Sequence, residues 1–314
     1  MEKKQKQDCP LLEICDLSVS FRMYDSALGQ RDLQVISNLS IKVHTGEILA
    51  IAGSSGSGKS LLASAILGIL PENATAVGDM RYDGQILTPE LQEQLRGNEM
   101  SLVPQSIAYL DPLMRAGAQA DGHKKPYPTA KRKGVFGRLG LSESTEKCYP
   151  FELSGGMARR VLVSTALITD ARLIIADEPT PGMSLHQALE ALTLFREMAD
   201  EGKAVILITH DIDLAFAFAD KIAVFYAGTT VETASALDFR MGPESLRHPY
   251  SKALWRALPQ NGFEPIAGSQ PYAGNLPKGC LFAPRCSCKS AKCEQEAPPM
   301  RELRGGEVRC FYAM

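Results

Sequence analysis

One stretch of the chain has the residue types and spacing that suit phosphate binding, the segment 53–60 with the sequence GSSGSGKS. It lies between an apolar run that ends at Ala52 and a helix-like run that begins at Leu61. In this strand–loop–helix context, glycines let backbone N–H groups turn towards phosphate oxygens, and the new helix adds its positive N-terminal end. We therefore expect a nucleoside triphosphate to bind Gly53, Ser54, Ser55, Gly56, Ser57, Gly58, Lys59 and Ser60.

Within this loop, Lys59 can reach the outer phosphates and the Ser60 hydroxyl can hold Mg²⁺. The alternative is a flexible Gly/Ser linker, but a linker has no reason to separate a buried strand from an apolar helix. Two carboxylates, Asp177 and Glu178, follow the apolar run 173–176. We expect Asp177 to hold Mg²⁺ through water and Glu178 to orient or deprotonate an attacking water, although such a strand end can also be ordinary loop chemistry.

Another short apolar run, 204–208, leads to His210. A histidine at a strand end is usually structural. In parallel sheets, however, the carboxyl ends of the strands converge where ligands bind, so His210 can reach the terminal phosphate. Gln105 follows the short strand-like run 99–104, and on its own says little.

The remaining pattern predicts an α/β fold. Residues 11–19 and 35–43 alternate apolar and polar side chains, as in a half-exposed antiparallel sheet, whereas the buried runs alternate with helices, as in a doubly wound parallel sheet. The helix after the phosphate loop is predicted to close at Pro71. Phe21 or Tyr24 could stack on an adenine base or simply pack, and no spacing rule separates the two.

Composition narrows the class of protein. The 314 residues are 45% hydrophobic, enough for a full core with one or two appendages, and the net charge of −2 gives no general attraction to nucleic acid. No apolar run approaches the ~20 residues of a membrane-spanning helix, and the polar N-terminus does not resemble a secretory signal. We expect a cytosolic protein with reduced thiols.

A second pair of glycines, in Ser154-Gly155-Gly156, precedes the helical stretch 158–167. The N-terminus of this helix is a second place where an anion could bind. A basic, proline-containing tract at 123–133 reads more readily as a solvated loop than as a binding surface.

Taken in this order, the phosphate loop, Gln105, the LSGG segment 153–156, Asp177-Glu178 and His210 resemble the ATPase subunits of ABC transporters. The resemblance covers roughly residues 11–235. It implies a P-loop ATPase core of mostly parallel sheet flanked by helices, with an antiparallel β subdomain, at 1–105 and 155–236. The stretch 106–154, short for the family, becomes an inserted helical subdomain that contacts the permease.

The resemblance also implies roles for individual residues. Gln105 would sense the γ-phosphate and Mg²⁺ and touch the membrane partner, and His210 would be the switch histidine. Ser154, Gly155 and Gly156 would clamp ATP that is bound to the opposite subunit. In the family, the phosphate loop of one subunit and the signature segment of another, here residues 154–156, together form one ATP site. A second ATPase subunit is therefore required.

The C-terminal part, 237–314, resembles the extension of peptide and nickel importer ATPases, through HPYSKAL at 248–254 and GCLFAPRC at 279–286. The phrase YPFELSGGM at 149–157 points the same way. The implied partners are two permeases and an external solute-binding protein, which would hold this subunit at the cytoplasmic face of the cell membrane. The cargo would be peptides, nickel or metal chelates.

The extension contains a four-cysteine motif, C-x5-C-x6-C-x16-C, at Cys280, Cys286, Cys293 and Cys310. Four thiolates can hold a [4Fe–4S] cluster or tetrahedral zinc. The missing C-x2-C pair argues against a zinc ribbon, and the resemblance to related tails favours the iron–sulfur cluster. A reduced, metal-free tail is the alternative, and Cys288 is an extra thiol that could replace a neighbour.

The chain departs from the family pattern at Ser184, where the family usually has an aspartate that crosses to the partner site. We therefore predict a non-identical partner ATPase and two unequal ATP sites. Two other classes of function stay open on the residues alone: a soluble ABC ATPase that acts on nucleic acid or ribosomes, and a redox-regulatory protein with vestigial hydrolysis. The near-neutral charge argues against the first and the intact Lys59 and Glu178 against the second.

Overall fold

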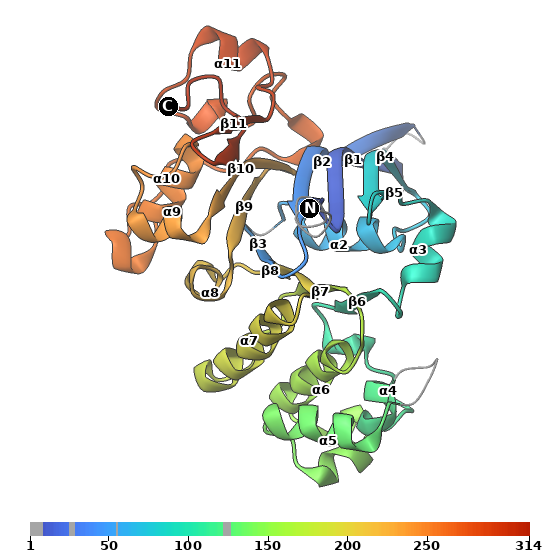
Figure 1. Ribbon diagram of the computed structural model, residues 1–314. Coiled ribbons are helices and arrows are strands. Elements are labelled where there is room, and N and C mark those ends of the chain that lie inside the picture. The colour runs from blue at the N-terminus through green and yellow to red at the C-terminus, as the bar shows by residue number, and fades with distance from the viewer. Residues whose placement is uncertain (1–8, 25–28, 55, 122–126) are drawn as a thin grey trace, which may run out of the picture.

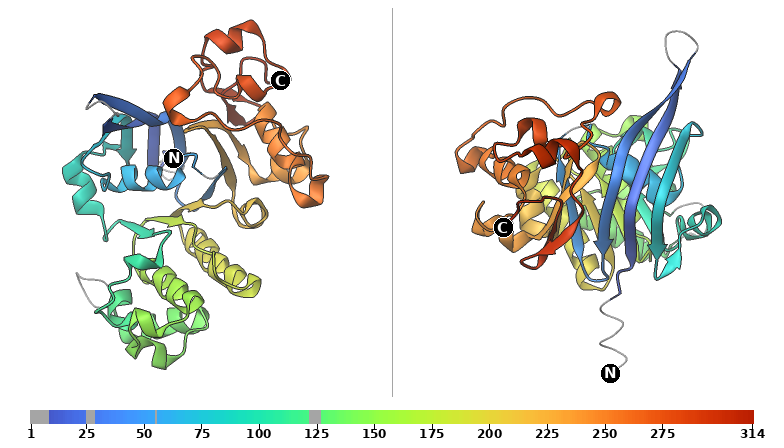
Figure 2. Two further views of the ribbon diagram at one scale, coloured as in Figure 1. Left: turned by 180° about the vertical axis from the view of Figure 1, so that it is seen from behind. Right: turned by 90° about the horizontal axis from the view of Figure 1, so that it is seen from above.

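The computed structural model describes residues 9–24, 29–54, 56–121 and 127–314. The chain builds two sheets, a lobe of short helices at one end and a C-terminal segment at the other (Figures 1 and 2). In the described residues, no helix combines the length and apolar character needed to cross a bilayer.

The main sheet has eight strands in the order β11-β12-β10-β9-β3-β8-β7-β6. Strands β6, β7, β8, β3 and β9 run parallel, and β10, β12 and β11 extend the sheet by antiparallel pairing. The strands are β3 (Ile48–Gly53), β6 (Met100–Val103), β7 (Leu173–Asp177), β8 (Ala204–Ile208), β9 (Lys221–Tyr226), β10 (Thr229–Ser235), β11 (Arg301–Leu303) and β12 (Gly306–Val308).

The smaller sheet is antiparallel, in the order β2-β1-β4-β5. Its strands are β1 (Leu12–Tyr24), β2 (Gln30–Val43), β4 (Ala74–Tyr82) and β5 (Gln85–Ile86). The alternation predicted for the first two strands is confirmed, although both are longer than the sequence pattern indicated. Ser37 in β2 donates its N–H to the Gly228 carbonyl, which ties this sheet to the β9–β10 turn.

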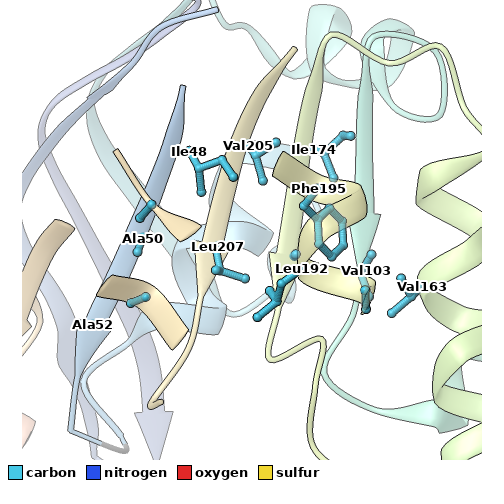
Figure 3. Close-up of a cluster of buried hydrophobic side chains, with 14 of the residues drawn as sticks. Ile48, Ala50, Ala52, Val103, Val163, Ile174, Leu192, Phe195, Val205 and Leu207 are labelled. Carbon is cyan, nitrogen blue, oxygen red and sulfur yellow. The ribbon is translucent and has the colours of Figure 1, made fainter. Parts of the chain in front are cut away.

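The central strands β3, β7 and β8 are buried on both faces because different layers cover the two sides of the sheet. Along β3, Ile48, Ala50 and Ala52 face one core, while Leu49 and Ile51 face the other. The first core is closed by helices α6 (Gly155–Leu167) and α7 (Leu185–Asp200), whose inward side chains appear in Figure 3. The second is closed by α2 (Lys59–Leu67) and the antiparallel sheet. Continuous apolar runs are typical of strands buried on both faces.

Helix α2 ends at Leu67, and the prediction that Pro71 closes it is wrong. Gly68 adopts a left-handed conformation, and its N–H donates to the Ala65 carbonyl, which satisfies the end of the helix three residues before the proline. Glycine commonly terminates helices in this way because it lacks the Cβ penalty of the left-handed region.

The remaining helices are short. They are α3 (Pro89–Leu95), α4 (Ala116–Asp121), α5 (Thr129–Arg138), α8 (Ile212–Phe218), α9 (Ala236–Met241), α10 (Pro249–Arg256) and α11 (Ala291–Gln295). Helices α4 and α5 pack on α6 and form the lobe at the bottom of Figure 1. Of the basic tract, residues 123–126 lie outside the described part of the chain, and the rest begins α5.

A buried ion pair attaches the C-terminal segment to the main sheet. The side chains of Glu232 on β10 and Arg247 are 0% and 1% exposed. Glu232 accepts hydrogen bonds from the backbone N–H groups of Arg247 and His248, and Arg247 donates to the carbonyls of Leu303 and Arg304 in the β11–β12 hairpin. The pair therefore joins β10, the segment before α10 and the hairpin at one point.

We predict that Arg247→Met destabilises the fold by about 3–5 kcal/mol, because it leaves the Glu232 carboxylate buried without its cation. Urea denaturation followed by circular dichroism measures this loss. The matched control is Arg256→Met, which removes an exposed pair with Glu244 and should change stability by no more than about 0.5 kcal/mol. Equal stability of the two variants would contradict the assigned role of Arg247.

Candidate nucleotide site

The phosphate loop leaves β3 at a point where only glycine fits. A Cβ on Gly53 would lie 2.4 Å from the Phe225 carbonyl oxygen of the neighbouring strand β9. At the other end of the loop, Gly58 has φ +91° and begins α2. The close approach to β9 explains why position 53 requires glycine, and the left-handed conformation explains why position 58 does.

Lys59, the first residue of α2, is only 8% exposed and folds back over the loop. Its Nζ donates to the carbonyl oxygens of Gly53 and Ser54, each at 2.9 Å. Burial lowers the pKa of Lys59, and the nearby carboxylates of Glu178 and Asp177 oppose that shift. The ammonium group is therefore held at the loop by its carbonyls and kept charged by the two acids.

Asp177, the last residue of β7, is 5% exposed. Burial raises its pKa, and a hydrogen bond with Ser60 is the largest effect that opposes the rise. Its Oδ1 atom has no hydrogen-bond partner among the described residues. A buried, unpartnered carboxylate oxygen beside a hydroxyl fits a hard cation such as Mg²⁺, which prefers oxygen ligands.

Glu178 and His210 contact each other at the same edge of the sheet. The Nδ1 atom of His210 lies 2.8 Å from Oε2 of Glu178. Glu178 is nearly buried and has a left-handed backbone, with φ +50°, whereas the side chain of His210 is 67% exposed. Because such a conformation is unfavourable for a residue other than glycine, it indicates that the surrounding structure fixes the direction of the Glu178 carboxylate.

These groups open onto one cavity of about 580 Å³. It is lined by Val35, Gly56, Gly58, Lys59, Ser60, Leu61, Gln105, Asp177, Glu178 and His210. The structure therefore brings together a cationic loop, a buried carboxylate, a carboxylate–imidazole pair and an amide, which suits a phosphate chain with its metal and an attacking water.

Other residues predicted for the nucleotide do not line this cavity. Phe21 packs against the core below the antiparallel sheet, and Tyr24 lies exposed near the end of β1, so the choice of adenine-stacking ring stays open. Gly53, Ser54 and Ser57 belong to the loop behind the cavity, while Ser55 lies outside the described residues.

The signature segment, Ser154-Gly155-Gly156, does not line the cavity. Ser154 caps α6, its hydroxyl oxygen accepting the N–H of Met157. Ser154 and Gly155 are exposed, and a Cβ on Gly155 would meet no atom within 4 Å. The start of the helix is thus exposed, and it does not line the cavity that holds Lys59.

Arg159 on α6 is a residue of the site that the sequence reasoning missed. Its guanidinium donates to the backbone carbonyls of Pro104 and Gln105, and it is nearly buried. Burial lowers its pKa, and Asp177 and Glu178 oppose that shift. Arg159 therefore links the signature helix to the Gln105 loop. The only available signal was an arginine three residues after Gly156, and nothing in the sequence shows its long-range partner.

The cysteines predicted to hold a metal gather round a second cavity, of about 300 Å³. Cys280, Cys286, Cys293 and Cys310 line it, as does Cys288, and all five thiols are free. Burial raises the pKa of Cys280 and of Cys286. Across the described residues, no three or more Cys, His, Asp or Glu side chains are arranged closely enough to hold a metal ion. The metal assignment therefore stays a prediction.

Comparison with known proteins gives this geometry its family. The "ABC transporter" family matches residues 36–181, and the "Oligopeptide/dipeptide transporter, C-terminal region" matches residues 231–293. The Escherichia coli (strain K12) Oligopeptide transport ATP-binding protein OppD is 35% identical over 98% of this chain and 94% of its own length. The chain belongs to this family of ABC-transporter ATP-binding proteins.

A second relative supports the same family, and a solved structure shows the same fold. The Bacillus subtilis (strain 168) Dipeptide transport ATP-binding protein DppD is 34% identical, over 92% of this chain and 90% of its own length. A solved dimeric ATP-binding cassette bound to ADP and Pi shares the fold, with a TM-score of 0.63 and 24% identity over 72% of this chain and 98% of that chain. As a member of the ABC ATPases, the chain is an ATP hydrolase.

Replacing Lys59 tests the site directly. We expect Lys59→Ala to weaken ATP binding about 10- to 100-fold and to abolish measurable hydrolysis, because the loop loses its charge-assisted phosphate contact. Lys42→Ala, which removes an exposed lysine on β2, is the control and should bind and hydrolyse ATP normally. Phosphate release and calorimetric titration with ATP make the comparison, and unchanged hydrolysis in Lys59→Ala would overturn the assignment.

Proposed function

We propose that this chain is the ATPase subunit of a membrane importer of peptides, with nickel or metal chelates as the alternative cargo. The supporting observation is the near full-length similarity to oligopeptide and dipeptide transport ATP-binding proteins, which extends through residues 231–293 of the C-terminal part. The proposal places it at the cytoplasmic face of the cell membrane, held there by two permeases that receive solute from an external binding protein.

In the proposed mechanism, Lys59 binds the outer phosphates of ATP, while Ser60 and Asp177 hold Mg²⁺. Glu178 takes a proton from the attacking water, or orients it, and His210 fixes the Glu178 carboxylate through the 2.8 Å contact. The Gln105 amide, on a backbone held by Arg159, reports the state of the phosphate to the permease.

A second ATPase subunit completes the site in this proposal. Ser154, Gly155 and Gly156 do not line the cavity that holds Lys59, and this supports a role in binding a nucleotide on another chain. ATP then favours the closed pair of subunits because it binds that state more tightly, and this difference in affinity drives the permeases.

A groove of about 780 Å³ supplies a docking place for the permease. Residues 96–102, Gln119, Ala120 and Thr165 contribute to its lining, between the core and the helical lobe. Tyr109 and Leu113, in the segment after Gln105, are exposed. Exposed apolar side chains in the segment after Gln105 suit a protein partner better than nucleic acid, which disfavours the ribosome- or DNA-directed alternative.

We also propose that the partner ATPase is a different chain. Ser184 replaces the aspartate usual in the family and is occupied locally, because its hydroxyl oxygen accepts the N–H of Gln187 at the start of α7. A neutral serine cannot supply the negative charge that the family places between the two sites. The two ATP sites are then unequal.

Reconstitution with the permeases and the partner ATPase in lipid vesicles tests the function. Binding protein loaded with a peptide should stimulate ATP hydrolysis and peptide uptake, whereas nickel-loaded binding protein should not. Stimulation by nickel alone would replace peptide with the alternative cargo, and co-purification with RNA rather than permeases would refute the importer. Glu178→Gln should reduce uptake-coupled hydrolysis to a different extent from the equivalent change in the partner, and equal losses would contradict the asymmetry.

For the cysteine motif we propose a [4Fe–4S] cluster held by Cys280, Cys286, Cys293 and Cys310, with zinc as the alternative. The support is that these four thiols share one cavity, although they are not yet within ligating distance of a common ion.

Anaerobic purification tests the cluster. The protein should be brown and contain about four irons per chain, and Cys293→Ser should lose both colour and iron. Cys9→Ser, which removes an exposed thiol far along the sequence, is the matched control and should keep both. Stoichiometric zinc would select the alternative, and a colourless protein without either metal would remove the proposal.

A further inference from the structure

A segment of the C-terminal extension touches the phosphate loop from outside the nucleotide cavity. We call residues 262–276, which connect the region after α10 to the cysteine motif, the strap. Its last part packs against β2, as the orange segment beside the blue strands in Figure 2 shows. The strap then reaches the loop at the side chain of Gln270.

Ser54 is the residue that the strap contacts. Its hydroxyl donates a hydrogen bond to Oε1 of Gln270, across 216 positions of sequence. Burial raises the pKa of Tyr250 on α10, and Ser54 is the group that most strongly opposes that rise. Ser54 is thus the point at which the side chain of Gln270 joins the C-terminal extension to the phosphate loop.

Ser54 affects the ATP site because its backbone helps to hold Lys59 in position. The Ser54 carbonyl is one of the two that accept from the Lys59 Nζ. A contact that fixes Ser54 therefore also fixes the position of the ammonium group that meets the phosphates.

The strap is itself anchored. Arg285 donates to the carbonyls of Ile266 at 2.9 Å and Ala267 at 2.8 Å, and its guanidinium lies over the ring of Tyr226, 5.8 Å from the centroid. Tyr250 packs on the Tyr226 ring, with centroids 4.5 Å apart. Tyr226 of β9 therefore contacts both Tyr250 and Arg285, the residue that holds the backbone of the strap.

We propose that Gln270 is a positioning residue for the phosphate loop, so that the C-terminal extension sets the affinity of this subunit for ATP. The extension acts by ordering the loop before ATP arrives. Without it, binding has to order the loop as well, and part of the interaction energy is lost to that ordering.

The test is ATP affinity in the full-length chain, measured by calorimetric titration with Mg-ATP in the Glu178→Gln background, which prevents turnover. Gln270→Met keeps the length of the side chain but removes the acceptor, and Ser54→Ala removes the donor. Each should weaken ATP binding about 3- to 10-fold, the range expected for one hydrogen bond. The double variant should bind no more weakly than either single variant, because the two changes remove one interaction.

Two further measurements separate positioning from a general effect. Ser269→Ala, on the exposed neighbour in the strap, should leave ATP affinity unchanged. In wild-type Glu178 chains, Gln270→Met should raise KM for ATP more than it lowers kcat. Unchanged affinity in Gln270→Met, additive effects in the double variant, or a lowered melting temperature with normal affinity would each overturn a positioning role.

Discussion

Charge buried at one edge of a sheet is the constraint on which this structure depends. Lys59, Arg159, Asp177 and Glu178 are all nearly inaccessible to water, and burial shifts the pKa values of the first three. Isolated charges in such a place would be very unfavourable, so they persist because they offset one another and because backbone carbonyls take up the remaining donors. The arrangement leaves the Oδ1 atom of Asp177 without a hydrogen-bond partner among the described residues. A site for a metal-bound polyanion requires such an oxygen.

The architecture explains how charges from distant positions meet there. The parallel strands β3, β7 and β8 end at the same edge, and each is followed by part of the site: the phosphate loop, Asp177 with Glu178, and His210. Two cores, one on each face, hold those strand ends in register. The positions of the site residues therefore depend on apolar packing that takes no part in the chemistry.

Much of this could be read from the sequence, because local pattern and local chemistry coincide at the strand ends. The buried runs before Gly53, Asp177 and His210 predicted three strands correctly, and the spacing of the loop predicted its helix. The end of α2 at Gly68 was missed because proline was given more weight than a glycine cap. Phe21 and Tyr24 stay undecided because both depend on a bound base.

Contacts made by long side chains across the fold were beyond sequence reasoning. Arg159 reaches the Gln105 carbonyl over 54 positions, and Gln270 meets Ser54 over 216. Neither pairing leaves a periodic or compositional trace, because the partner is in one case a backbone atom and in the other an ordinary serine. The same holds for the arrangement of the cysteines, whose spacing shows how many thiols there are but not how closely they approach.

The hairpin β11–β12 has a consequence for the way the protein is made. It covers the edge of β10, and it accepts the Arg247 side chain through Leu303, 56 positions later in the chain. At ~5–20 residues per second, a ribosome needs roughly 3 to 11 s to travel that distance. During this interval the backbone of β10 lacks its final neighbour and can pair with another nascent chain, so the later-synthesised hairpin protects this edge from aggregation.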